Sequence, residues 1–88
     1  PGKRIFLCYA LLDREGALRG YVIYYINGNN NTAHIVDLFV DDPETTTNDI
    51  IVAFARRLNA DGISSAVFNV VGSERFFNIL KKYGITYN

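Results

Sequence analysis

Two side chains that can exchange protons stand in the apolar segment TAHIVDLFV, residues 32–40. His34 is the only histidine of the chain, and imidazole titrates near neutrality, so it is a candidate general base. Strict strand alternation places His34 on one face with Val36, Leu38 and Val40. A partly buried structural histidine is the alternative interpretation.

Asp37 falls on the opposite face of the same segment, between Ile35 and Phe39. A carboxylate among apolar neighbours is costly unless it is paired or near solvent, which makes Asp37 a candidate functional group. The alternative is a structural carboxylate whose partner is one of three basic residues on neighbouring strands: Arg19, Lys3 or Arg4.

The stretch VDDPETTTNDI, residues 40–50, joins this segment to an amphipathic helix and carries four acidic residues but no glycine. Phosphate loops at such junctions use glycine to bring backbone N–H groups onto the anion. Thr46 and Asp49 are spaced as a capping box, which predicts a loop that caps its own helix. A weak anion site formed by threonine hydroxyls and free N–H groups is the alternative.

The composition restricts the class of protein. The chain has 88 residues, 49% of them hydrophobic, which is typical of one folded domain spanning 1–88. Nine basic and nine acidic side chains leave no net charge, so neither a nucleic-acid nor a membrane partner is favoured. The single cysteine, Cys8, lies in IFLCYALL and is predicted to be a small buried hydrophobe.

Cysteine and histidine usage also bears on location and metals. One cysteine and one histidine argue against a zinc site, and no metal is expected. Without a signal-type N-terminus they indicate a reducing compartment, so we expect a cytoplasmic protein. The chain begins at Pro1 without an initiator Met, so we also expect it to be part of a longer protein.

The hydrophobic pattern predicts an α+β fold, an antiparallel β-meander followed by α-β-α(-β). Strands are expected at 3–12, 19–26 and 32–40, with Asn27-Gly28 closing a hairpin. A helix over 47–60, a strand over 63–70, a second helix capped by Ser73 and a last strand in ITYN complete the order. The apolar stripes of the two helices are Ile51, Phe54, Ala55, Leu58 and Phe76, Phe77, Leu80, Tyr83.

The second and third strands are apolar on both faces, because both alternating sets of YVIYYI are apolar or aromatic. Two short helices cover one face of such a sheet. We therefore expect the other face to meet an N-terminal half that is missing from the chain, or a second copy of the chain in a homodimer.

The order of elements and several segments resemble the GNAT superfamily of acyl-CoA-dependent N-acyltransferases. The similar segments are RGYVIYYINGNN, HIVDLFVDDPE leading into a helix, and AVFNVVGSERFFNILKKYGI. They cover nearly all of this chain but only about two thirds of a family domain, whose first strand and next two helices have no counterpart here. The resemblance implies a mixed sheet with flanking helices.

The resemblance also implies site residues for transfer of an acyl group from acetyl-CoA, or another acyl-CoA, to an amine. The cofactor-binding positions are Phe39, Val40, Thr46, Thr47, Asn48 and Ser73, and the catalytic candidates are His34, Asp37 and Tyr83. The sequence departs from the family at the glycines of the pyrophosphate loop, and Leu80 stands where many members carry the general-acid tyrosine. The second hypothesis is therefore a non-catalytic accessory or protein-interaction domain of the same fold that has lost CoA binding.

Overall fold

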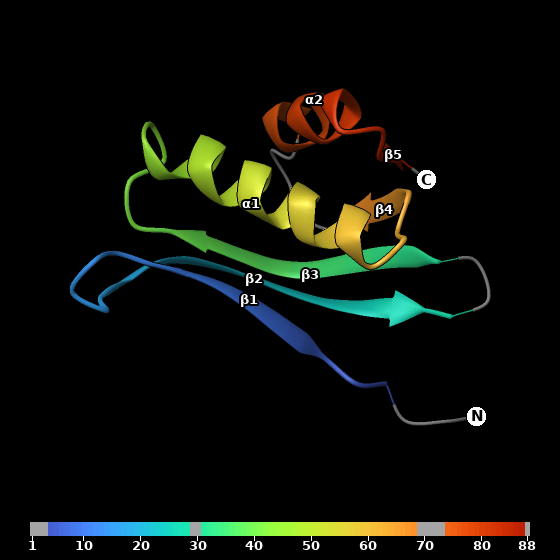
Figure 1. Ribbon diagram of the computed structural model, residues 1–88, viewed down its shortest axis with the longest axis horizontal. Coiled ribbons are helices and arrows are strands. Elements are labelled where there is room, and N and C mark those ends of the chain that lie inside the picture. Colours follow the sequence, from blue (N-terminus) through green and yellow to red (C-terminus); the bar gives the residue numbers. More distant parts are fainter. Residues whose placement is uncertain (1–3, 29–30, 69–73, 88) are drawn as a thin grey trace.

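The computed structural model describes residues 4–28, 31–68 and 74–87. Its strands form one mixed sheet in the order β1-β2-β3-β4-β5, in which β1 to β3 are antiparallel and β3, β4 and β5 are parallel (Figure 1). The predicted α+β class and the order of a meander followed by α-β-α-β are confirmed. The elements are β1 (Leu7–Leu12), β2 (Leu18–Asn27), β3 (Thr32–Val40), α1 (Thr46–Ala60), β4 (Ser65–Phe68), α2 (Glu74–Lys82) and β5 (Thr86–Tyr87).

The turn between β1 and β2 is held by its own polar residue. The Asp13 carboxylate accepts hydrogen bonds from the backbone N–H groups of Glu15 and Ala17, at 2.8 and 2.9 Å. Gly16 has a φ of +86°, a conformation that glycine adopts without the cost of a Cβ. The Asp13 hydrogen bonds and the conformation of Gly16 fix the turn that brings β1 and β2 together.

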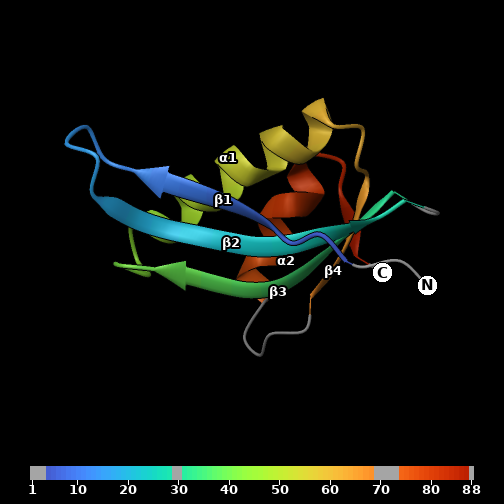
Figure 2. The same cartoon turned by 90° about the horizontal axis from the view of Figure 1, so that it is seen from below.

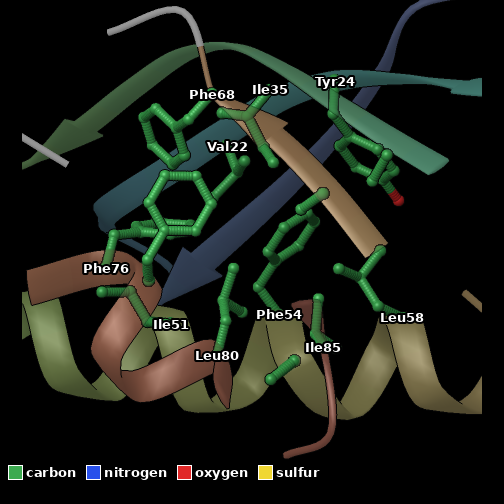
Figure 3. Packing of buried hydrophobic residues seen from close by; sticks show 14 of the residues in the cluster. Val22, Tyr24, Ile35, Ile51, Phe54, Leu58, Phe68, Phe76, Leu80 and Ile85 are labelled. Atoms are coloured by element: carbon green, nitrogen blue, oxygen red, sulfur yellow. The ribbon is translucent and has the colours of Figure 1, made fainter. Parts of the chain in front are cut away.

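Both helices pack on the same face of the sheet, and the single core lies between them and that face (Figures 1 and 3). Phe54 of α1 is fully buried at its centre, with its ring 4.9 Å from that of Tyr24 and 6.3 Å from that of Phe76. The stripe predicted for α1 is confirmed, since its four residues are buried, and they are Ile51, Phe54, Ala55 and Leu58. In α2 the buried residues are Phe76, Phe77 and Leu80.

The opposite face of β1, β2 and β3, here called the open face, has no described helix over it (Figure 2). Its cross-strand rows include Cys8, Ile23 and Asp37 in the middle and Ala10, Tyr21 and Phe39 beside them. The prediction that two helices leave one face of the sheet uncovered is confirmed for the described residues.

A register shift in β3 changes which residues share a face. Ile23 pairs with Asp37 and the next residue, Tyr24, pairs with Ile35, so Val36 is an extra residue in the ladder, as in a β-bulge. Strict alternation therefore fails, and the expected grouping of His34 with Leu38 and Val40 is wrong. His34 lies on the open face together with Asp37, whereas Leu38 and Val40 pack against the core.

Several predicted details also need correction. The first strand begins at Leu7 and not at residue 3, and Cys8 is exposed because its face of the sheet is uncovered. Helix α2 ends at Lys82, so Tyr83 stands in the turn after it, where Gly84 takes a φ of +78°. The fourth strand is shorter than predicted within the described residues, at Ser65–Phe68.

Candidate functional site

A closed set of three side chains fixes the junction between the sheet and α1. Arg19 of β2 donates to the Asp41 carboxylate at 2.9 Å and to the Thr46 hydroxyl at 2.8 Å. The Thr46 hydroxyl in turn donates to Asp41 at 2.6 Å. That hydrogen bond, and then the Arg19 guanidinium, hold the pKa of Asp41 below its usual range. The charge of Asp41 is therefore compensated inside the junction.

The predicted capping box is wrong. The N-cap of α1 is Thr45, which makes no side-chain capping hydrogen bond, and Thr46 is the first helical residue. The Thr46 hydroxyl is used by Asp41 and Arg19, and its backbone N–H donates to the Asp42 carbonyl at 2.8 Å. Burial explains the change, because Thr46 is fully buried and its hydroxyl needs partners inside the fold.

A surface groove runs between α1 and α2, with a volume of about 430 Å³. Among the described residues that line it, the cations are Arg75 and Lys82 and none carries a carboxylate. Arg75 donates to the Asn48 side-chain carbonyl at 3.1 Å and to the Pro43 carbonyl at 3.5 Å, which fixes it at the N-terminal end of α1. Seven residues line this α1–α2 groove: Asn48, Val52, Arg75, Asn78, Ile79, Lys82 and Tyr83.

The parallel ladder between β3 and β4 joins residues 32–35 of β3 to Ser65–Phe68, and Phe68 is the last described residue before Glu74. The rest of β3, from the bulge at Val36 to Val40, continues beyond that ladder toward the junction with α1.

His34 lies on the open face and stacks on Tyr25, with ring centroids 4.6 Å apart and planes 5° from parallel. Its Nε2 atom is buried and has no hydrogen-bond partner among the described residues. Arg4 lies over the same tyrosine, 4.8 Å from the ring centroid. A hollow of about 710 Å³ next to these side chains extends to Gly28.

Asp37 is exposed on the same face, and its described side-chain partner is Tyr21, whereas Lys3, one of the predicted partners, lies outside the described residues. The Tyr21 hydroxyl donates to Asp37 at 3.0 Å, and this hydrogen bond raises the pKa of that phenol. Of the predicted basic partners, Arg19 pairs instead with Asp41, because it lies at the start of β2 beside the junction. Exposure and two neutral donors, the Tyr21 hydroxyl and the Leu38 backbone N–H, account for the carboxylate among the described residues.

The predicted site residues fall into two groups on opposite sides of the sheet. The α1–α2 groove contains Asn48 and Tyr83, while His34 and Asp37 lie on the open face. The other cofactor-binding candidates are dispersed or lie outside the described residues: Phe39 is exposed and stacks on Tyr21, Val40 is half-buried opposite Gly20, Thr46 is buried in the junction, Thr47 is half-buried, and Ser73 is not among the described residues.

Sequence reasoning missed Arg75 and Lys82. They stand seven residues apart on α2, with Asn78 and Ile79 between them, so helical periodicity places them on one face. That spacing was visible in the sequence. The position of this face beside the start of α1 depends on the packing of the two helices and was not.

The described residues contain no group of histidine, cysteine and acidic side chains that could hold a metal ion. Among the helices that the structure describes, none is long and apolar enough to cross a membrane. Comparison with known proteins gives no match, whether with family models, with curated proteins or with solved structures.

Proposed function

We propose that this chain is a GNAT-like, acyl-CoA-dependent N-acyltransferase domain that holds the phosphates of acetyl-CoA or another acyl-CoA in the α1–α2 groove. The observation that carries the proposal is the position of Arg75, which donates to Asn48 in the first turn of α1 and lines the same groove as Lys82. The order of meander, helix, parallel strand and helix agrees with the same class of enzyme.

The groove has the chemistry that a phosphate needs. An arginine binds phosphate through two parallel N–H donors and a lysine adds a mobile charge. The N-terminal end of α1 contributes the positive end of its dipole. The acidic loop before α1 repels an anion less than its sequence suggests, because the positive charge of Arg19 compensates the negative charge of Asp41. Asp42 and Glu44 remain exposed, so we expect binding to be weak.

The backbone of β3 offers a path from this groove toward a reaction centre. The amide groups of a pantetheine arm would pair with the backbone of β3 along Phe39 and Val40. In acyl transfer the amine nitrogen attacks the thioester carbon, the C–S bond breaks, a base takes the amine proton and an acid protonates the thiolate. Tyr83 is the candidate acid because it lines the groove.

The candidate bases, His34 and Asp37, lie on the open face. If the cofactor enters from the helix side, the amine would approach from the open face, on the other side of β3.

Calorimetric titration with CoA tests the binding proposal. We expect Arg75→Gln to weaken binding about tenfold or more, because a hydrogen bond between charged groups contributes about 1.5–3 kcal/mol. Arg56→Gln is the matched control, since Arg56 is an exposed cation of α1 that lines a different hollow. Equal affinity for the wild type and Arg75→Gln would refute the groove as the phosphate site.

The second candidate is a non-catalytic interaction domain of the same fold that has lost CoA binding. It is favoured by one observation: the catalytic candidates lie on two sides of the sheet, and the open face carries exposed apolar side chains such as Phe39. Release of free thiol from acetyl-CoA in the presence of amines separates the two candidates. Amine-dependent thiol release that is lost in Tyr83→Phe supports the enzyme; the absence of both thiol release and CoA binding supports the interaction domain.

A further inference from the structure

Strand β1 is the first strand of the sheet and has a ladder partner on one side only. It pairs with β2, and the described residues place no strand along its other edge. A row of unpaired N–H and C=O groups is a template for another strand. Proteins usually protect such edges with charges, proline or strong irregularities. Here residues 5–12, IFLCYALL, contain no charge and no proline, and the register is regular from Leu7 to Leu11.

The side chains along this edge are unusually exposed for their type. Of the six large hydrophobic side chains that are exposed in the described residues, four belong to residues 5–12. They include Ile5 at 76% exposure and Phe6 at 56%. Exposed apolar side chains concentrated on an unpaired edge indicate a contact surface for another polypeptide.

The charges at the two ends of the segment favour a second copy of the same chain. Arg4 precedes residues 5–12 and Asp13 follows them. Parallel pairing of two copies would place Arg4 against Arg4. Antiparallel pairing avoids this repulsion, because the Arg4 end of each copy meets the Asp13 end of the other, and it generates a closed two-fold dimer. We propose that two copies of this chain associate by antiparallel pairing of their β1 strands into one continuous sheet.

The faces of the sheet select the register of this pairing. Directly opposed residues of an antiparallel pair point to the same face, so outer residues must oppose outer residues. Cys8 and Ala10 both point to the open face, as shown by their pairing with Ile23 and Tyr21. This condition is met when the two Cys8 residues lie opposite each other at the two-fold axis, which is pairing centred on Cys8. Phe6 then lies opposite Ala10 of the second copy. Pairing centred on Tyr9 meets this condition as well but opposes Arg4 to Arg14 of the second copy.

Pairing centred on Cys8 has a measurable consequence. The two Cys8 residues would be directly opposed, with Cα atoms about 4.5–5.5 Å apart, a separation that a disulfide spans. Diamide would then take two electrons and two protons from the two thiols and leave one S–S bond. Cys8 is the only cysteine and is exposed, so a covalent dimer reports this contact alone.

Sedimentation equilibrium of the 88-residue chain is the first test. We expect a monomer–dimer equilibrium that Phe6→Lys weakens at least tenfold, because its ammonium would be buried against Ala10 of the second copy. Phe39→Lys is the matched control, an equally large and exposed side chain on β3, away from this edge. A dimer that Phe39→Lys dissociates and Phe6→Lys leaves intact would overturn edge pairing in favour of face-to-face packing.

The register has its own test on non-reducing gels after diamide treatment. We expect rapid covalent dimerisation of the wild type, none in Cys8→Ser, and slow dimerisation in Cys8→Ser/Ala10→Cys. In the double variant the two thiols would lie four residues apart along the pair, about 14 Å. Equal rates for the wild type and the double variant would overturn the register. A wild-type chain that stays monomeric up to about 1 mM would overturn the dimer and leave the edge to a strand of different sequence.

Discussion

Gly20 lies where β2, β3 and the start of α1 approach one another. It is buried in β2 and pairs with Val40 of β3. A Cβ added there would lie 2.7 Å from the backbone carbonyl oxygen of Phe39 and 3.1 Å from the Cδ1 atom of Ile50. A carbon and an oxygen that are not bonded need about 3.2 Å, so β3 must move by about half an ångström. Gly20→Ala therefore forces a shift of backbone and not of a side-chain tip.

The expected cost follows from this geometry. Overpacking of a buried site destabilises by about 1–3 kcal/mol, and the reduced freedom of the unfolded chain returns about 0.4–1 kcal/mol. The net loss in the free energy of unfolding is about 1–2 kcal/mol, from a total of about 4–13 kcal/mol for a chain of this length. For a domain of this size Tm should fall by about 4–16 °C.

Thermal and urea unfolding followed by circular dichroism measures this loss. Gly28→Ala is the matched control, because an added Cβ there meets nothing within 4 Å. We expect its stability to stay within about 0.5 kcal/mol of the wild type. If Gly20→Ala proves as stable as Gly28→Ala, the close approach of β2, β3 and α1 at this point is wrong, and with it the position of the junction.

Three further predictions concern single contacts. The Thr46 hydroxyl holds the pKa of Asp41 below its usual range, so Asp41 stabilises the fold fully above the ordinary carboxyl pKa and loses that effect as the pH falls through the lowered value. In urea unfolding measured as a function of pH, Asp41→Asn should therefore reduce the fall of the midpoint at acid pH. The same fall in the variant as in the wild type would contradict this. Asp37→Asn should return the raised pKa of Tyr21 toward that of an ordinary phenol, as measured by NMR of its ring carbons, and no change would exclude their hydrogen bond. Phe54→Ala should cost about 3–5 kcal/mol in urea unfolding, and a cost below about 1 kcal/mol would contradict its central place in the core.

The sequence predicts most of this fold, because its local signals agree with the packing. The apolar stripe of α1 and the glycines that follow the two helices are visible as helical periodicity and as helix ends. The uncovered face of the sheet also follows from the sequence, because the sequence predicts only two short helices for a meander that is apolar on both faces. These features depend on short-range spacing, which the sequence displays directly.

The predictions that failed depend on tertiary contacts. The bulge at Val36 is one extra residue in a ladder, and no residue type in TAHIVDLFV marks it, yet it moves His34 to the other face. The Thr46 hydroxyl could have formed a capping box or bonded to Asp41. It donates to Asp41 because Arg19 of β2 approaches both groups, a contact that the sequence does not display. The groove cations were visible as a spacing on α2, but the contact of Arg75 with Asn48 required the position of α1.

Amide-resolved NMR during titration with CoA and acetyl-CoA tests the proposed function most directly. The account predicts saturable shifts confined to the α1–α2 groove, at Thr47, Asn48 and residues 75–83, and to β3 from Val36 to Val40. Raised salt should weaken them, because exposed ion pairs are screened. If millimolar cofactor shifts none of these amides, or shifts only those of the open face around Tyr25, the groove is not a CoA site and the proposal is contradicted.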